Sequence, residues 1–258
     1  MRILLWLVLF LTAVTLVFVP FIYVQTTRRM PPLETEFEIQ KMVKSEIESE
    51  RRAYRNPIPD LEPVPVEFLK PDLATLPRLL VSGYLLAMGC PGYLESPREE
   101  SFAWWKRLAF SYRGESLPGD GACELLFASN LAGHLGSTAN AETTHLAVAR
   151  IHGLLTKEAL LAYELETTHF MAGIWGPRDA CHALLTKKLD DLSPGELAEV
   201  MLAFPPYWYW AEVQFCKNTT LIRQSRDTVI NSWVRSGLLS EAEGQKALRQ
   251  RLACETRP

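Results

Sequence analysis

The amino-acid sequence predicts a mainly α-helical protein preceded by one N-terminal transmembrane helix. From about Leu73 onward, apolar residues recur at helical spacing, and no convincing alternating pattern of strands is found. Two segments, Ser193-Pro194-Gly195-Glu196 and Ser240-Glu241-Ala242-Glu243, carry a capping residue followed three positions later by a glutamate, which is typical of a helix start. With 258 residues, 48% of them hydrophobic, the chain is long enough for one good-sized core.

The first segment, residues 3–25, predicts a membrane anchor. Residues 3–24 are apolar apart from two threonines and a tyrosine, and no charged residue lies between Arg2 and Arg28. A helix of roughly 20 such residues spans a bilayer. The following VQTTRRM has no small-residue cleavage site, so we expect an uncleaved signal anchor. Charges on its two sides leave the orientation open.

Residues 26–71 are expected to connect the anchor to a domain over residues 72–254. Residues 33–54 are charged with a thin apolar stripe, which predicts either a helix standing off the membrane or, as the preferred alternative, a solvated spacer. The Pro-rich passage NPIPDLEPVPVEFLKP is expected to be extended or irregular, because proline cannot continue a helix and restricts the residue before it.

Charge and cysteine spacing exclude several functional classes. A net charge of −3 provides neither a field for nucleic acid nor a polybasic membrane patch. The five cysteines allow up to two disulfides with one left over, and they form no CxxC motif. No cysteine–histidine cluster has zinc spacing, and the five histidines are scattered, so neither a metal nor a cofactor is expected.

The stretch from Thr156 to Phe204 carries a family resemblance. Two helical patterns flank the turn Gly173-Ile174-Trp175-Gly176, and the helix start at Ser193 follows. This order resembles the second half of the peptidoglycan glycosyltransferase domain, glycosyltransferase family 51, with its sKdEILelYLN, aromatic-Gly turn, Ala-rich helix and dLsxxExAxLA. The matching positions are Lys157, Glu158, Leu160, Leu161, Leu165, Phe170, Gly173, Gly176, Ala180, Leu192, Ser193, Glu196 and Ala198. The resemblance implies a lysozyme-like α-helical domain on the extracytoplasmic side of a bacterial inner membrane.

The family polymerises lipid II, and a glutamate in its first motif, EDxxFxxH, acts as general base on the acceptor sugar hydroxyl. In this sequence Gly89 stands at the position of that glutamate, Cys90 replaces the aspartate and Ser96 replaces the histidine. Only the aromatic residue is kept, as Tyr93. Glycine cannot accept a proton, so the base is absent. Glu95, six residues further on, is the best fallback candidate.

The family's second motif, GGSTITQQLAKN, holds the donor's phosphates. Its counterpart keeps the glycine pair and the closing asparagine, which are Gly119, Gly121 and Asn130. The serine and both threonines are lost, and Asp120 and Glu124 add negative charge where a diphosphate would bind.

The third motif, RKxxE, falls on residues 140–144, where Thr144 stands at the second catalytic glutamate. All three motifs are therefore dismantled. The leading hypothesis is a pseudoenzyme that binds an envelope or cell-wall protein, or peptidoglycan glycan or lipid II. A divergent lipid II polymerase that uses Glu95 is the first alternative. The other is a hydrolase in which one buried glutamate acts as general acid.

The resemblance also implies contacts between distant cysteines, because motifs one and two line the same cleft in the family. Cys90 and Cys123 are then candidates for a disulfide, and Cys181 and Cys216 are a second candidate pair. The alternative is that all five cysteines are small buried hydrophobic residues.

An aromatic run follows Pro205-Pro206. Tyr207, Trp208 and Trp210 are candidates for a retained glycan or lipid groove, because aromatic rings stack on sugar faces. The alternative for these side chains is packing in the core.

Overall fold

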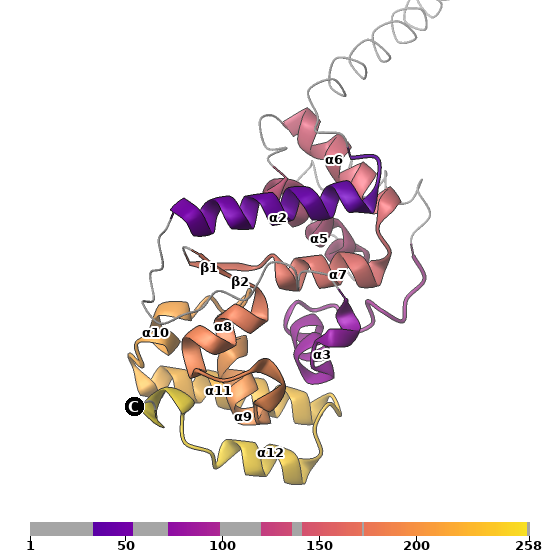
Figure 1. Ribbon diagram of the computed structural model, residues 1–258. Helices are drawn as coiled ribbons and strands as arrows, with labels where there is room; N and C mark the ends of the chain where they lie inside the picture. Colours follow the sequence, from indigo (N-terminus) through magenta and orange to yellow (C-terminus); the bar gives the residue numbers. More distant parts are fainter. Residues whose placement is uncertain (1–32, 54–71, 99–119, 136–140, 172, 257–258) are drawn as a thin grey trace, which may run out of the picture.

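The computed structural model of the protein describes residues 33–53, 72–98, 120–135, 141–171 and 173–256. These residues are mainly helical, which confirms the predicted fold class at that level (Figure 1). The predicted anchor, residues 3–25, lies outside the described residues, and so does most of the linker. Among the described helices, none is both long and apolar enough to cross a membrane.

In the described residues, helices occur along the whole domain. They are α2 (Glu36–Ala53), α3 (Arg78–Ala87), α5 (Asp120–His134), α6 (Ala141–Leu154), α7 (Lys157–Glu166), α8 (Gly176–Leu185), α9 (Pro194–Met201), α10 (Trp210–Gln214), α11 (Thr219–Arg235) and α12 (Glu241–Leu248). Three 3-10 turns, Leu73–Thr75, Leu189–Asp191 and Ala253–Thr256, complete the helical elements of the described ranges.

A short antiparallel hairpin separates α7 from α8. It pairs β1 (His169–Met171) with β2 (Ile174–Trp175). The sequence showed no strand pattern, because strands of three and two residues are too short for an alternation to be visible. Gly176 follows the hairpin with φ +70°, and a Cβ there would lie 2.9 Å from the backbone oxygen of Glu166. Glycine therefore lets α8 start directly beside the end of α7.

Both predicted capping boxes are present. In α9 the Ser193 side chain accepts from the backbone N–H of Glu196, while the Glu196 carboxylate accepts from the backbone N–H of Ser193 at 2.9 Å. The same reciprocal arrangement joins Ser240 and Glu243 at the start of α12. These helix starts are set by local sequence, because each box satisfies two backbone donors that the helix itself leaves free.

An aromatic cluster forms the centre of the core. The ring of Tyr84 on α3 lies 6.1 Å from Phe127 on α5 and 6.0 Å from Phe204 after α9, and Tyr93 lies 5.3 Å from Phe127. All four side chains are fully buried. This cluster joins α3, α5 and the segment after α9 into one core. Helix α7, which is buried along most of its length, packs in the same core.

Helix α2 belongs to the packed domain. In Figure 1 it runs across the domain above α7 and the hairpin, and Ile39, Val43 and Ile47 are buried in the core. Arg51 at its end pairs with Asp179 on α8. The preferred expectation of a solvated spacer is therefore wrong for this segment, because its thin apolar stripe, at four-residue spacing, is covered by the domain.

Two disulfides are present in the described residues. Cys90 bonds to Cys123 with a Cα–Cα distance of 6.5 Å, which is the pair that the family resemblance implied. The pairing of Cys181 with Cys216 is wrong. Cys181 is a free, fully buried thiol on α8, whereas Cys216 bonds to Cys254 near the C-terminus with a Cα–Cα distance of 5.3 Å.

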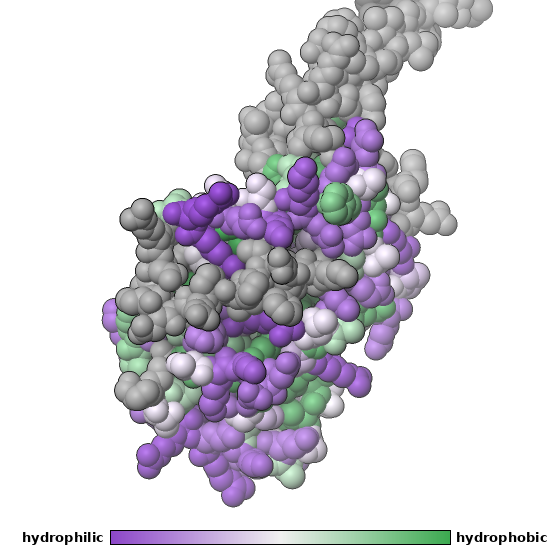
Figure 2. Space-filling view, viewed as in Figure 1, coloured by the Kyte–Doolittle hydropathy of each residue, from purple (hydrophilic) through white to green (hydrophobic). Residues whose placement is uncertain are grey.

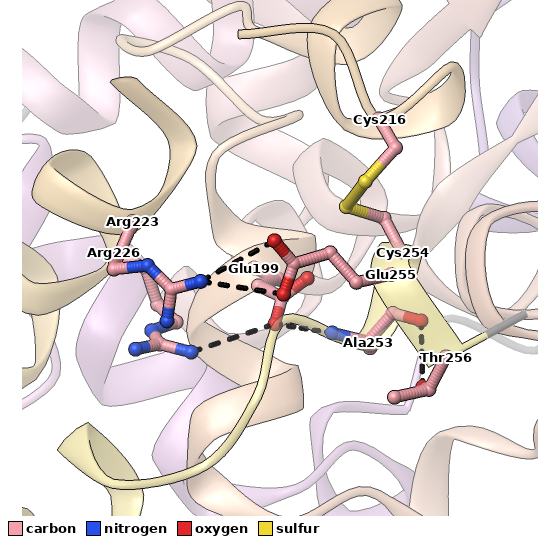
Figure 3. The surroundings of a disulfide bond; sticks show 8 residues. All are labelled: Glu199, Cys216, Arg223, Arg226, Ala253, Cys254, Glu255 and Thr256. Atoms are coloured by element: carbon pink, nitrogen blue, oxygen red, sulfur yellow. Dashed lines mark hydrogen bonds and ion pairs between the residues drawn. A yellow bond between two sulfur atoms is a disulfide. The ribbon is translucent and has the colours of Figure 1, made fainter. Parts of the chain in front are cut away.

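The second disulfide lies beside a buried ion pair, as Figure 3 shows. Arg226 on α11 lies 3.9 Å from the Glu199 carboxylate on α9, and the backbone N–H of Ala253 donates to the same carboxylate at 2.8 Å. Both charged side chains are almost completely buried. The Cys216–Cys254 bond and the Ala253 hydrogen bond therefore fix residues 253 and 254 against α9 and the connection between α10 and α11.

The packing of α2 gives a first prediction. Ile47→Ala should lower the free energy of unfolding by about 2–4 kcal/mol, because it removes a fully buried side chain from a close-packed core. The matched control is Phe37→Ala on the exposed side of the same helix, where the side chain is 71% exposed and the change should stay within about 0.5 kcal/mol. Unfolding of the detergent-solubilised full chain measures both. Equal effects of the two variants would contradict the packing of α2.

Candidate functional site

The residues at the family's first motif lie in the turn after α3, and they form a closed structural site. Gly89 has φ +78° and Cys90 is in the disulfide with Cys123. Tyr93 is buried, and its hydroxyl donates to the backbone oxygen of Lys157 at 3.3 Å. Glu95 is exposed. A fallback base at Glu95 therefore lacks the enclosed environment that tunes a catalytic carboxylate.

The described positions from the second and third motifs lie on α5 and α6, two helices that pack against each other. Gly119 lies outside the described residues, and Gly121 is in the first turn of α5. Thr144 is on α6, although its side chain lies outside the description. Of the kept motif-two residues, Asn130 lines an open cleft, which is described below.

Glu124, whose negative charge we expected to oppose a bound diphosphate, has its charge balanced by neighbouring basic side chains. Its carboxylate is 2% exposed, with His152 Nε2 at 2.9 Å and Arg98 Nε at 3.3 Å. Burial by itself raises the pKa of Glu124, but the hydrogen bond and charge of His152, together with Arg98 and Lys157, outweigh it and hold the pKa below its ordinary value. An ionised carboxylate with these partners stabilises the fold and gives no proton to a substrate.

An open cleft of about 450 Å³ lies between α5, the end of α7, the hairpin and the loop after α9. The described residues that line it are Ser129, Asn130, Gly133, His134, Glu164, Thr167, Thr168, His169, Pro205 and Trp208. Most are polar, and one is a large exposed aromatic residue. Clefts of this size that combine an aromatic surface with a few convergent polar groups are typical ligand sites.

Glu164 is the chemically distinctive residue of this cleft. Its side chain comes from the buried helix α7 and the residue is only 5% exposed. The Tyr84 hydroxyl donates to its Oε1 at 2.8 Å, and the Asn130 side-chain amide donates to Oε1 at 3.0 Å and to Oε2 at 3.2 Å. Burial raises the pKa of Glu164 to about 7, although both hydrogen bonds act in the opposite direction. This carboxyl can therefore hold or release a proton near neutral pH.

Of the three aromatic candidates after Pro205-Pro206, one lines the cleft. Trp208 is 58% exposed and has φ +55°, a left-handed conformation that is uncommon for a bulky residue. Tyr207 is half-buried and packs against the core. Trp210 begins α10, and its side chain lies outside the description. The structure thus brings together Asn130 and Trp208 from two separate sequence motifs.

Two histidines on the cleft wall are held from behind by α2. His169 Nε2 lies 2.8 Å from Glu50, and His134 Nδ1 lies 4.0 Å from Glu46. Burial, and then the nearby His169, lower the pKa of His134. Burial, and then the charge of Glu50, raise the pKa of Glu46 to about 7. Helix α2 does not line the cleft itself, but its Glu46 and Glu50 lie beside two histidines that do.

The charge of the cleft limits its ligands. No lysine or arginine is found among the described residues that line it. A diphosphate needs cations or several aligned amide donors, so the described lining is suited to a neutral, hydroxyl-rich molecule. Across the described part of the chain, no group of three or more histidine, cysteine or acidic side chains is arranged to hold a metal ion.

Sequence reasoning missed Glu164, although the residue lies within the stretch that carries the family resemblance. Helix α7 contains three glutamates, Glu158, Glu164 and Glu166, and composition does not distinguish them. A usable signal was its spacing. Glu164 follows Leu160 and Leu161 by four and three residues, so it lies on the apolar face of the helix.

Neither the family models nor the curated proteins give a match to this chain.

The environment of Glu164 gives a second prediction, which concerns stability. Its folded-state pKa of about 7 exceeds the ordinary 4.5, so the folded protein binds this proton more tightly than the unfolded chain. The contribution of this proton to the free energy of unfolding is fully present below about pH 4.5. It is lost as pH rises through about 7, which lowers the free energy of unfolding by up to about 3 kcal/mol. Glu164→Gln should remove this part of the pH dependence, because glutamine does not titrate.

Thermal unfolding of the two proteins from pH 4.5 to 8 measures the difference. The variant should gain stability relative to the wild type as pH rises. Glu158→Gln, which changes an exposed carboxylate on the same helix, is the matched control and should follow the wild type. Parallel curves for wild type and Glu164→Gln would contradict the raised pKa.

Proposed function

We propose that this protein is a membrane-anchored, extracytoplasmic glycan-binding protein on a glycosyltransferase 51-like, lysozyme-like scaffold, and that it does not polymerise lipid II. Residues 3–25 provide the inner-membrane anchor, and the cleft around Glu164 binds the glycan part of peptidoglycan. The observation that carries the proposal is the composition of this cleft. It combines exposed Trp208, the hydrogen-bonding residues Asn130, Thr167 and Thr168, and no lysine or arginine among its described lining residues.

Each feature supports a sugar as the ligand. The exposed indole ring of Trp208 offers a flat apolar face, on which the C–H face of a sugar ring stacks. Amide and hydroxyl groups beside it match the hydroxyl and acetamido groups of peptidoglycan sugars. The absence of cations from the described lining favours the neutral glycan over the diphosphate of lipid II.

The distribution of hydrophobic residues on the surface argues against the alternative of a protein partner. In Figure 2 hydrophilic side chains cover most of the described part of the visible face. The large exposed hydrophobic residues among the described ones are Phe37, Leu94, Leu126, Trp208 and Phe215, and they come from separate elements. A specific protein interface of standard size has an apolar centre, which scattered single residues do not provide. Glycan is therefore the preferred ligand.

The loss of polymerase activity is tested with purified full-length protein, lipid II and divalent metal in detergent, beside a family member of normal sequence. We expect no polymer, because glycine at position 89 provides no base and Glu95 is exposed. Polymer made by the wild type but not by Glu95→Gln would overturn this part of the proposal and establish the alternative of a relocated base.

Glycan binding is tested with soluble peptidoglycan oligosaccharides by calorimetry. Trp208→Ala should weaken binding about tenfold, equivalent to about 1.4 kcal/mol, because it removes the stacking surface. The matched control is Phe215→Ala, since Phe215 is 61% exposed but lies away from the lining of the cleft. Equal affinities for wild type and Trp208→Ala, or no binding by the wild type, would count against a glycan site at this cleft.

A further inference from the structure

Resting on the proposed glycan-binding function, we propose that the cleft also cleaves the glycan that it binds, with Glu164 as the acid that protonates the glycosidic oxygen. The substrate class is a neutral chain of linked amino sugars of the peptidoglycan type. Three observations carry this inference. Glu164 is a buried carboxyl that lines an open cleft, it is oriented by two hydrogen-bond donors, and it shares the cleft with the exposed ring of Trp208.

The two donors decide which oxygen carries the proton. Oε1 of Glu164 accepts from the Tyr84 hydroxyl at 2.8 Å and from the Asn130 amide at 3.0 Å, whereas Oε2 accepts one longer hydrogen bond, from the same amide at 3.2 Å. Burial and the neighbouring Glu164 raise the pKa of Tyr84, so its phenol stays protonated and acts as the donor. Because Oε1 accepts the two shorter hydrogen bonds and the Tyr84 hydroxyl donates to Oε1 alone, a proton on the carboxyl belongs on Oε2. Oε2 is then the atom that donates to a bound substrate.

The same contacts hold the acid in one orientation. Tyr84 is fully buried in the aromatic cluster with Phe127 and Phe204, so its hydroxyl is fixed by the core. The second donor, Asn130, comes from a different helix, α5. A general acid is effective only when its proton is held within hydrogen-bond reach of the leaving oxygen. Tyr84 and Asn130 act here as positioning residues.

The reaction balances with water as the only co-reactant. Oε2–H transfers its proton to the glycosidic oxygen, the bond between that oxygen and the anomeric carbon breaks, and the leaving sugar departs as an alcohol. The anomeric carbon, which carries the developing positive charge, is captured by water. The proton lost by this water returns to the Glu164 carboxylate, which is left ready for another cycle. One glycosidic bond and one water give two hydroxyl groups.

Two other buried glutamates of the described chain, Glu124 and Glu166, do not meet these conditions. Glu124 is held ionised by His152 and Arg98 and does not line the cleft. Burial raises the pKa of Glu166 to about 7, but Glu166 faces α8 beside Gly176 and is also absent from the cleft lining. Among these three residues, only Glu164 combines a raised pKa with a place in the cleft lining.

The test is digestion of purified peptidoglycan and its soluble oligosaccharides by the full-length protein in detergent, with products separated and weighed by mass spectrometry. The wild type should release fragment pairs whose summed mass exceeds that of the parent chain by one water. Glu164→Gln should reduce cleavage at least 100-fold and keep oligosaccharide binding within about threefold, because glutamine retains the shape and the acceptor for Tyr84. Glu158→Gln on the exposed side of α7 should cleave like the wild type.

A second variant keeps the test valid if Glu164→Gln does not fold. Glu164→Asp retains a carboxyl but withdraws it by one methylene, and should slow cleavage at least tenfold. Undiminished cleavage by a folded Glu164 variant would overturn the inference. So would binding of oligosaccharides by the wild type without cleavage, which would leave the proposed binding function intact. If the wild type neither binds nor cleaves, the proposed function fails as well.

Discussion

The hydrogen-bonded carboxyl of Glu164 is the constraint around which the centre of the domain is arranged. It lies on α7, which is buried along most of its length, and its partners come from α3 and α5. A carboxyl at this depth is costly unless its oxygens are satisfied, so α3 and α5 must present Tyr84 and Asn130 in register. The aromatic cluster that includes Tyr84 and Phe127 fixes the same helices from the apolar side. Packing and polar satisfaction therefore impose one arrangement.

The contrast between Glu124 and Glu164 shows how environment assigns different chemistry to similar residues. Both carboxyls are almost fully buried, at 2% and 5% exposure. Glu124 faces His152 and Arg98, so its charged form is stabilised and its pKa is lowered. Glu164 meets only neutral donors, so burial prevails and its pKa rises to about 7. The two environments therefore shift the pKa values of the two carboxyls in opposite directions, which is how one domain can hold both a structural charge and an acid.

The candidate site of the protein does not lie in the turn where the family's first motif would place the catalytic base. The turn after α3 is closed by the Cys90–Cys123 disulfide and filled by Tyr93. The cleft lies instead at the end of α7, where the hairpin and the loop after α9 leave space beside Trp208. Helix α2 contributes indirectly, because Glu46 and Glu50 hold the two histidines of the cleft wall. A segment that looked like a spacer thus supports the site.

The sequence by itself determined the helical class, the two capping boxes and the helix starts at Ser193 and Ser240, because these depend on residues a few positions apart. Only the tertiary structure decided the role of Glu164, since its partners are 80 and 34 residues away in the chain. The same reason explains the pairing of Cys216 with Cys254 and the burial of α2. Local pattern shows that a residue faces a core, but the identity of the groups that meet it there depends on how distant helices pack.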